Sequence, residues 1–70
     1  MMPLTLMKTG ESQTIKPIGG REYTRRFLEN LGFVVGGTVT VVSELGGNVI
    51  VNVKDSRVAV SREMASKIMV

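Results

Sequence analysis

The sequence predicts a mainly β protein: a small, partly open antiparallel barrel with one inserted helix and a short C-terminal helical turn. Residues 38–41 and 49–53 are rich in β-branched side chains and contain the period-two alternation that is typical of strands. Between them, Leu-Gly-Gly-Asn at residues 45–48 supplies positions that tolerate a positive φ. Residues 21–31 follow a helical period instead. We therefore expect a hairpin-based sheet that carries one helix.

The N-terminal part of the chain predicts a turn followed by one strand. Residues 4–6 lead into a turn-rich cluster at residues 9–12, and residues 13–18 then have the pattern of a strand. Pro17 has no N–H to donate to a ladder. We therefore expect this strand at an edge of the sheet, or ending close to the glycine pair at 19–20.

Residues 21–31 predict a three-turn amphipathic helix. The apolar residues that form its stripe are Tyr23, Phe27, Leu28 and Leu31. Burial of the last three against the sheet is expected to stabilise the helix by about 1.5 to 3 kcal/mol each. Two charge pairs at four-residue spacing, Glu22 with Arg26 and Arg25 with Glu29, contribute about 0.5 kcal/mol each at most. Gly32 can take the left-handed conformation that ends a helix.

The C-terminal part predicts a second hairpin, a helical turn and a last short strand. A tight connection at residues 54–56 leads into a strand at residues 57–60, whose two valines share a face. Ser61 is placed to cap a helical turn over residues 62–67, and residues 68–70 close the chain as a strand. About five short strands without a long loop indicate a barrel of SH3-like size.

The composition excludes several classes of function. One domain, residues 1–70, is too small to hold both a core and a substrate cavity. The chain has no Cys for disulfides or thiolate chemistry, and no His, which is the usual base near neutral pH and the commonest metal ligand. Its hydroxyl groups and four lysines lack an activating neighbour in the sequence. We therefore expect no catalytic residues and no enzyme, and a core of aliphatic side chains that suits a reducing cytoplasm.

Ligand-binding motifs are missing as well. The acidic residues are scattered singly, which predicts no metal site, and the glycine doublets match turns rather than phosphate loops, which predicts no cofactor. The net charge of +3 is dispersed, and one Tyr with two Phe is too few for a base-stacking surface, so we expect no nucleic acid partner. No apolar run approaches the roughly 20 residues of a membrane span, and the N-terminus lacks the pattern of a signal peptide.

An ordered set of short motifs resembles the FeoA-type ferrous iron transport accessory proteins, which are small cytoplasmic SH3-like domains. The set spans nearly the whole chain and comprises residues 4–10, residues 15–20, residues 26–33, residues 35–41, residues 58–60, Ala65 and residues 68–70. Val35 departs from the family, which often has proline there, and so does the apolar hairpin tip. The resemblance implies an accessory protein of ferrous iron uptake. It would bind the cytoplasmic side of a FeoB-type membrane transporter, whose own domain hydrolyses GTP, and lie at the inner face of the membrane through that partner.

Four residues are candidates for partner contact. Leu45 is apolar at a hairpin tip, where turns are usually polar, and Arg25, Arg26 and Glu29 lie on the exposed helix face. Each has an ordinary alternative. Leu45 could instead fold back over the core, and the three charges could form a solvated helix face without a partner.

Two further interpretations stay open. The first is a protein-interaction domain like the SH3-like C-terminal domain of iron-dependent transcriptional repressors, which has this architecture. The second is weak self-association through an unpaired strand edge, which a short barrel can leave exposed.

Overall fold

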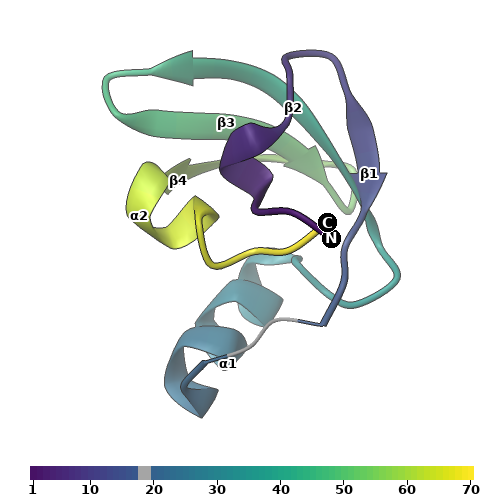
Figure 1. Cartoon of the computed structure of the whole chain (residues 1–70), viewed down its shortest axis with the longest axis vertical. Helices are drawn as coiled ribbons and strands as arrows, with labels where there is room; N and C mark the ends of the chain where they lie inside the picture. Colours follow the sequence, from purple (N-terminus) through teal and green to yellow (C-terminus); the bar gives the residue numbers. More distant parts are fainter. Residues whose placement is uncertain (18–19) are drawn as a thin grey trace.

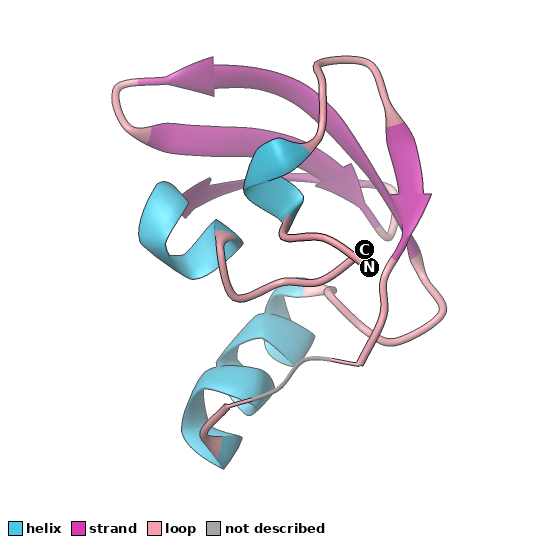
Figure 2. Ribbon diagram, in the orientation of Figure 1, coloured by secondary structure: helices cyan, strands magenta, loops and turns pink. Residues whose placement is uncertain are grey.

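The computed structural model describes residues 1–17 and 20–70, and its main element is one antiparallel sheet. The strands pair in chain order and are β1 (Ser12–Thr14), β2 (Thr38–Leu45), β3 (Asn48–Val53) and β4 (Ser56–Ser61). The helices are the 3-10 helix η1 (Leu4–Leu6), α1 (Glu22–Leu31) and α2 (Arg62–Ala65). The sheet curves over η1, α2 and the two chain ends, whereas α1 extends away from them (Figures 1 and 2). The predicted mainly β architecture is confirmed.

The predicted central hairpin is confirmed. β2 and β3 pair from Val39 opposite Val53 to Leu45 opposite Asn48, and the two-residue loop has φ of 58° at Gly46 and 82° at Gly47. Two successive positive φ values favour the primed turns whose twist matches that of a hairpin. A β-bulge between positions 41 and 43 bends β2 and lets the sheet curve.

The second hairpin also agrees with the prediction, although its turn contains no glycine. Val53 faces Ser56 across a loop in which Lys54 and Asp55 have φ of 50° and 60°. Ser61 ends β4 and caps α2, because its Oγ accepts a hydrogen bond from the Met64 N–H at 3.2 Å. The cap is as predicted, and the helix ends at Ala65, two residues before the predicted end at position 67.

The core lies between the inner face of the sheet and the segments beneath it. β3 shows the expected alternation, with Val49, Val51 and Val53 buried and the residues between them half-buried or exposed. The other buried apolar residues come from all parts of the chain and are Leu4, Met7, Ile15, Leu28, Phe33, Val39, Val41, Val60, Ala65, Ile68 and Val70. The expected aliphatic core is therefore present, and Phe33 is the aromatic residue within it.

α1 begins and ends close to the predicted positions. Arg21 precedes the helix in an extended conformation, and Gly32 follows it with φ of 112°. The Gly32 N–H donates to the Glu29 carbonyl at 2.9 Å, and the Phe33 N–H donates to the Leu28 carbonyl at 3.0 Å. These bonds satisfy carbonyls at the helix end and direct Phe33 into the core.

The strand predicted over residues 13–18 is wrong in its bounds. β1 starts at Ser12 and ends at Thr14, and position 18 lies outside the described residues. The Ile15 N–H still donates to the Gly37 carbonyl at 2.8 Å, but the Lys16 N–H donates to the Met69 carbonyl at 2.8 Å. The chain leaves β2 at this point because the C-terminal segment offers a new partner.

The predicted final strand over residues 68–70 is also corrected. Met69 forms an isolated bridge with Pro3, and on one side of it the backbones of Met2 and Val70 exchange hydrogen bonds of 3.0 and 2.8 Å. On the other side of the bridge the Leu4 N–H still donates to the Ile68 carbonyl at 2.8 Å, but the Ile68 N–H donates to the Ala65 carbonyl at 3.1 Å, and η1 begins at Leu4, so the pairing extends no further. Within residues 1–17 and 20–70 the sheet thus has four strands, not about five.

Candidate functional site

Two aromatic side chains on α1 face solvent. Tyr23 is 81% exposed and Phe27 is 43% exposed, and they are one helical turn apart. They line an open hollow of about 390 Å³ together with Glu22, Arg26 and Asn30. Arg26 is held over this hollow by a salt bridge to Glu22 of 2.9 Å, between side chains that are themselves mostly exposed.

The expectation that burial of Phe27 helps to fix the helix is therefore wrong in degree, because much of this side chain stays exposed. Leu28 is fully buried, and Leu31 is half-buried against the core, so α1 is anchored along one side and near its C-terminal end. At 100° per residue, Tyr23 and Phe27 lie at one edge of the apolar stripe and Leu28 at the other. The helix cannot bury both edges of so wide a stripe against one small core. Tyr23 lies only about 60° from Arg26 on the helical wheel, at the border between the apolar stripe and the charged side, and this position is the signal of its exposure.

The three charged candidates on α1 are exposed, as predicted, but they do not form one cluster. Arg26 lines the hollow beside the aromatic pair. Arg25 and Glu29 share the other side of the helix, because their positions are rotated by about 180° from that of Phe27. Of the three, only Arg26 adjoins the aromatic surface.

Leu45 lies at the tip of the β2–β3 hairpin and is 74% exposed. It does not fold back over the core. The tip and α1 are at opposite ends of the molecule (Figure 1). The four predicted contact residues are thus divided between two separate surfaces.

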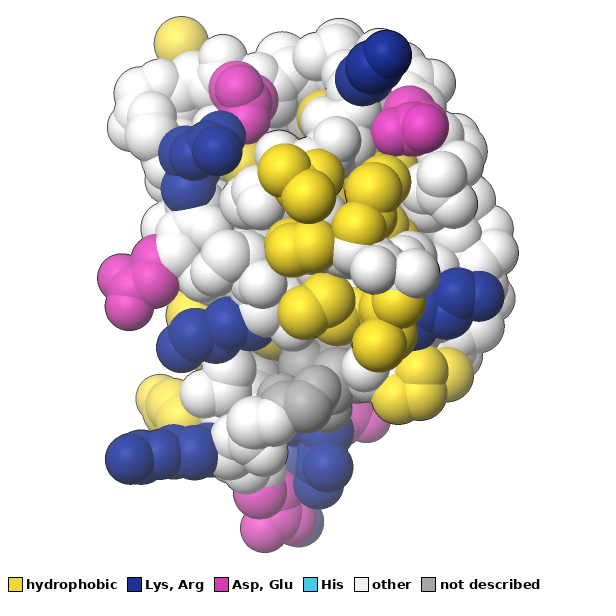
Figure 3. Space-filling view, viewed as in Figure 1, with side chains coloured by type: hydrophobic (Ala, Val, Ile, Leu, Met, Phe, Trp, Pro, Cys, Tyr) yellow, Lys and Arg dark blue, Asp and Glu magenta, His cyan; other side chains and the backbone are white. Residues whose placement is uncertain are grey.

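A third apolar surface is visible where η1, α2 and the chain ends meet (Figure 3). Leu6 is 65% exposed there, and the half-buried Met2 and Met64 pack against the core from this side. Methionine side chains adapt to many shapes, so such a surface suits contacts of low specificity.

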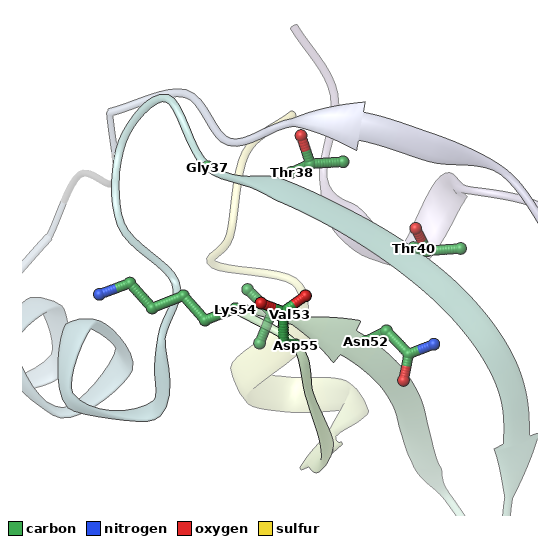
Figure 4. Close-up of a pocket in the computed structure, with 7 residues that line it drawn as sticks. All are labelled: Gly37, Thr38, Thr40, Asn52, Val53, Lys54 and Asp55. Atoms are coloured by element: carbon green, nitrogen blue, oxygen red, sulfur yellow. The ribbon is translucent and has the colours of Figure 1, made fainter.

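An open polar cleft of about 520 Å³ lies at one end of the outer sheet surface (Figure 4). Thr38 and Thr40 reach it from β2 and Asn52 from β3, whereas the Lys54 side chain extends toward α1. Ser12 Oγ and Thr40 Oγ1 lie 2.7 Å apart and hydrogen bond to each other on the same surface. Asp55, from the β3–β4 turn, also lines the cleft, so hydroxyl, amide and carboxylate groups there can bind water or a polar partner.

Two further kinds of feature are absent from the described residues. No group of three or more acidic, His or Cys side chains among them is placed to hold a metal ion. No helix in the same part of the chain is long and apolar enough to cross a membrane.

Comparison with known proteins assigns the chain to a family. A model of the FeoA domain matches residues 2–70. The chain is 34% identical over 70 residues to a Methanocaldococcus jannaschii protein named "Putative Fe(2+) transport protein A". The match covers all of this chain and 85% of that protein.

Solved structures agree with this assignment. A crystal structure of the iron uptake regulatory protein FeoA has a TM-score of 0.89 at 28% identity, over 97% of this chain and 90% of that one. The zinc complex of Stenotrophomonas maltophilia FeoA, described as a procaryotic SH3 domain protein, has a TM-score of 0.84 at 24% identity, over 99% and 88% of the two chains. This second likeness shows the fold alone, and the fold is the predicted SH3-like one.

A manganese-dependent transcriptional repressor has the same fold at 19% identity, with a TM-score of 0.82. The match covers 94% of this chain and only 38% of the repressor. Architecture is what the two share, and architecture alone does not carry function. The match of the family model over residues 2–70 and the 34% identity to the Methanocaldococcus protein do carry family membership: this chain belongs to the FeoA family of ferrous iron transport proteins.

Proposed function

We propose that this chain is a non-catalytic accessory protein that binds the cytoplasmic side of a FeoB-type membrane transporter and supports ferrous iron uptake. The observation that carries the proposal is the exposed aromatic pair on α1, Tyr23 and Phe27, beside Arg26. The family membership supplies the transport system. The partner supplies GTP hydrolysis, and this chain supplies a binding surface.

The α1 surface has the composition of a binding hot spot. Tyr, Phe and Arg are enriched in protein interfaces. The aromatic rings bury a large area with few rotatable bonds, and the Tyr hydroxyl and the Arg guanidinium can also form polar contacts. Tyr23 and Phe27 are both largely available to a partner, and the Glu22 salt bridge holds the Arg26 guanidinium close to them. A partner helix or loop that offers an apolar side chain and a carboxylate would match this surface.

The remaining predicted contact residues take secondary positions in the proposal. Arg25 and Glu29 lie on the far side of α1 and would contribute to the rim of the interface or to the rate of association. Leu45, at the distant hairpin tip, would make a second and separate contact. Through its partner, the protein would lie in the cytoplasm at the inner face of the membrane.

The test is a calorimetric titration into the purified full-length transporter from the same cell, in mild detergent with guanine nucleotide present. We expect saturable binding. The double variant Tyr23→Ala, Phe27→Ala should bind at least about tenfold more weakly, because hot-spot truncations cost 2 kcal/mol or more. Leu6→Ala is the matched control, since Leu6 is an apolar residue on a different surface and its exposure of 65% lies between those of Tyr23 and Phe27.

The controls separate a lost contact from a lost fold. Phe27 is partly buried, so Tyr23→Ala alone provides a variant that leaves the packing intact, and thermal unfolding should confirm this. Absence of binding in every nucleotide state would refute the proposal. Loss of binding in Leu6→Ala but not in the α1 variants would move the interface to the η1 surface.

A further inference from the structure

The outer edge of β4 presents backbone groups that no other strand covers. Among the described residues, β4 is the last strand of the sheet and pairs with β3 alone. The two strands are joined by a two-residue turn, across which Val53 of β3 faces Ser56 of β4. A hairpin with a two-residue loop makes this closing pair a hydrogen-bonded one, and bonded pairs then occur at every second position. Val58 and Val60 are therefore bonded to β3, and Arg57 and Ala59 direct their N–H and C=O groups away from it.

These outward groups have no partner within residues 1–17 and 20–70. No backbone or side-chain hydrogen bond joins Arg57 or Ala59 to another part of that region. Both residues are also exposed. Of the usual protections of an edge, β4 has the charge of Arg57, but it contains no proline and has no bulge against β3.

The opposite edge of the sheet is different. β1 is only three residues long, and directly after it the Lys16 N–H is bonded to the Met69 carbonyl. A long strand therefore cannot extend along β1 as it can along β4. Because just one of the two edges of the sheet can pair with a long strand, association favours a closed dimer over an open chain of subunits.

We infer that two copies of this chain associate through their β4 edges, antiparallel about a two-fold axis at Ala59. In this register Ala59 of one copy faces Ala59 of the other, and Arg57 of each copy faces Ser61 of the other. The four-stranded sheets join into one continuous sheet. This interface uses none of the α1 residues proposed to contact the transporter, and its formation does not require the transporter.

The sequence of β4 suits pairing with itself. Ala59 is the smallest side chain on the strand and lies at the axis, where two copies of one residue approach most closely. The valines flank it symmetrically, so the half-buried Val58 of one copy lies beside Val60 of the other on the inner face. No like charges face each other, because each Arg57 is opposite a serine.

Sedimentation equilibrium across a wide range of protein concentration tests the pairing. We expect a monomer at low concentration and a weak dimer at high concentration, as is typical of a small interface. Ala59→Glu places two carboxylates on residues about 5.5 Å apart across the axis. Its dimer should be at least about tenfold weaker at low salt, because facing like charges cost several kcal/mol. Ala59→Gln, with the same shape and no charge, should dimerise as strongly as the parent.

A second measurement locates the contact without any substitution. In NMR spectra recorded against concentration, the amide signals of Arg57 and Ala59 should shift, and those of Ser12 and Thr14 on β1 should not. A wild-type protein that stays monomeric at every concentration would overturn the inference. So would equal dimerisation of the Glu and Gln variants, or shifts confined to β1.

Discussion

The sheet and α1 differ in how they use their apolar residues. In β3, three valines have 2% exposure or less, and the residues between them are half-buried or exposed. In α1, Leu28 is the fully buried residue, and the two aromatic residues of the same stripe remain accessible. The sheet also gains stability from ladders on both sides of β2 and β3. Among the described residues, the backbone hydrogen bonds that leave α1 join it to residues directly before and after it, such as Gly32 and Phe33.

This difference indicates that stability and recognition are assigned to different elements. Apolar area already buried in the sheet stabilises the fold and offers little to a partner. Apolar area left open on α1 adds little to the fold and is available for binding. Substitutions of comparable size should therefore have very different effects in the two regions.

The largest expected contrast is between two aromatic truncations. Phe33→Ala removes a fully buried ring and should lower the free energy of unfolding by about 3 to 5 kcal/mol. Tyr23→Ala removes an exposed ring and should change it by no more than about 0.5 kcal/mol. Urea denaturation of both variants measures the contrast. A cost for Tyr23→Ala close to that of Phe33→Ala would mean that α1 packs far more tightly than its exposure indicates.

The junction between the two regions is Gly32. Its φ of 112° is strained for any residue with a side chain, and a Cβ there would lie 3.4 Å from Cγ1 of Val53. Gly32→Ala should cost about 1 to 2 kcal/mol, because left-handed conformations are unfavourable by that amount for other residues. Gly46→Asn is the control, since its φ of 58° suits asparagine and its surroundings are open. Equal stability of the two variants in thermal unfolding would contradict this assignment.

Much of the fold was predictable, because local signals and tertiary packing agree. The glycine pair at the β2–β3 turn, the alternating valines and the cap at Ser61 each specify a conformation within a few residues. The bounds of β1 and the final strand were not predictable in this way. They depend on bonds between residues far apart in the chain, such as Lys16 to Met69, which a local pattern does not contain.

The candidate site was predicted only in part, for a geometric reason. Periodicity shows that Tyr23 and Phe27 share a stripe with Leu28, but it does not show how much of the stripe the core can cover. In the structure, η1 and the C-terminal segment fill the inner face of the sheet with Leu4, Ile68 and Val70. Exposure of Arg26 followed from the sequence, exposure of Leu45 was one of two open alternatives, and exposure of the aromatic pair was not expected.

A smaller effect is expected at the helix cap that closes β4. Ser61→Ala removes the acceptor for the Met64 N–H and should cost about 1 kcal/mol. Ser61→Asp keeps an acceptor oxygen at the same place and should restore most of that loss. Urea denaturation of both variants distinguishes the role of Ser61 as the cap of α2 from its role as the last residue of β4. If Ser61→Asp were as unstable as Ser61→Ala, the cap hydrogen bond would not be what stabilises this end of the strand.

The smallest effects concern two exposed ion pairs, one in each region. Glu44 on β2 pairs with Arg62 on α2 and so joins two elements, whereas Glu22 pairs with Arg26 within α1. Exposed pairs contribute about 1 kcal/mol at most, and pairs within one helix about 0.3 to 0.5. Glu44→Gln should therefore lower the free energy of unfolding slightly more than Glu22→Gln, and high salt should remove the difference. A larger loss for Glu22→Gln would place α1 inside the cooperative unit formed by the sheet, and the separation of stability from recognition would then fail.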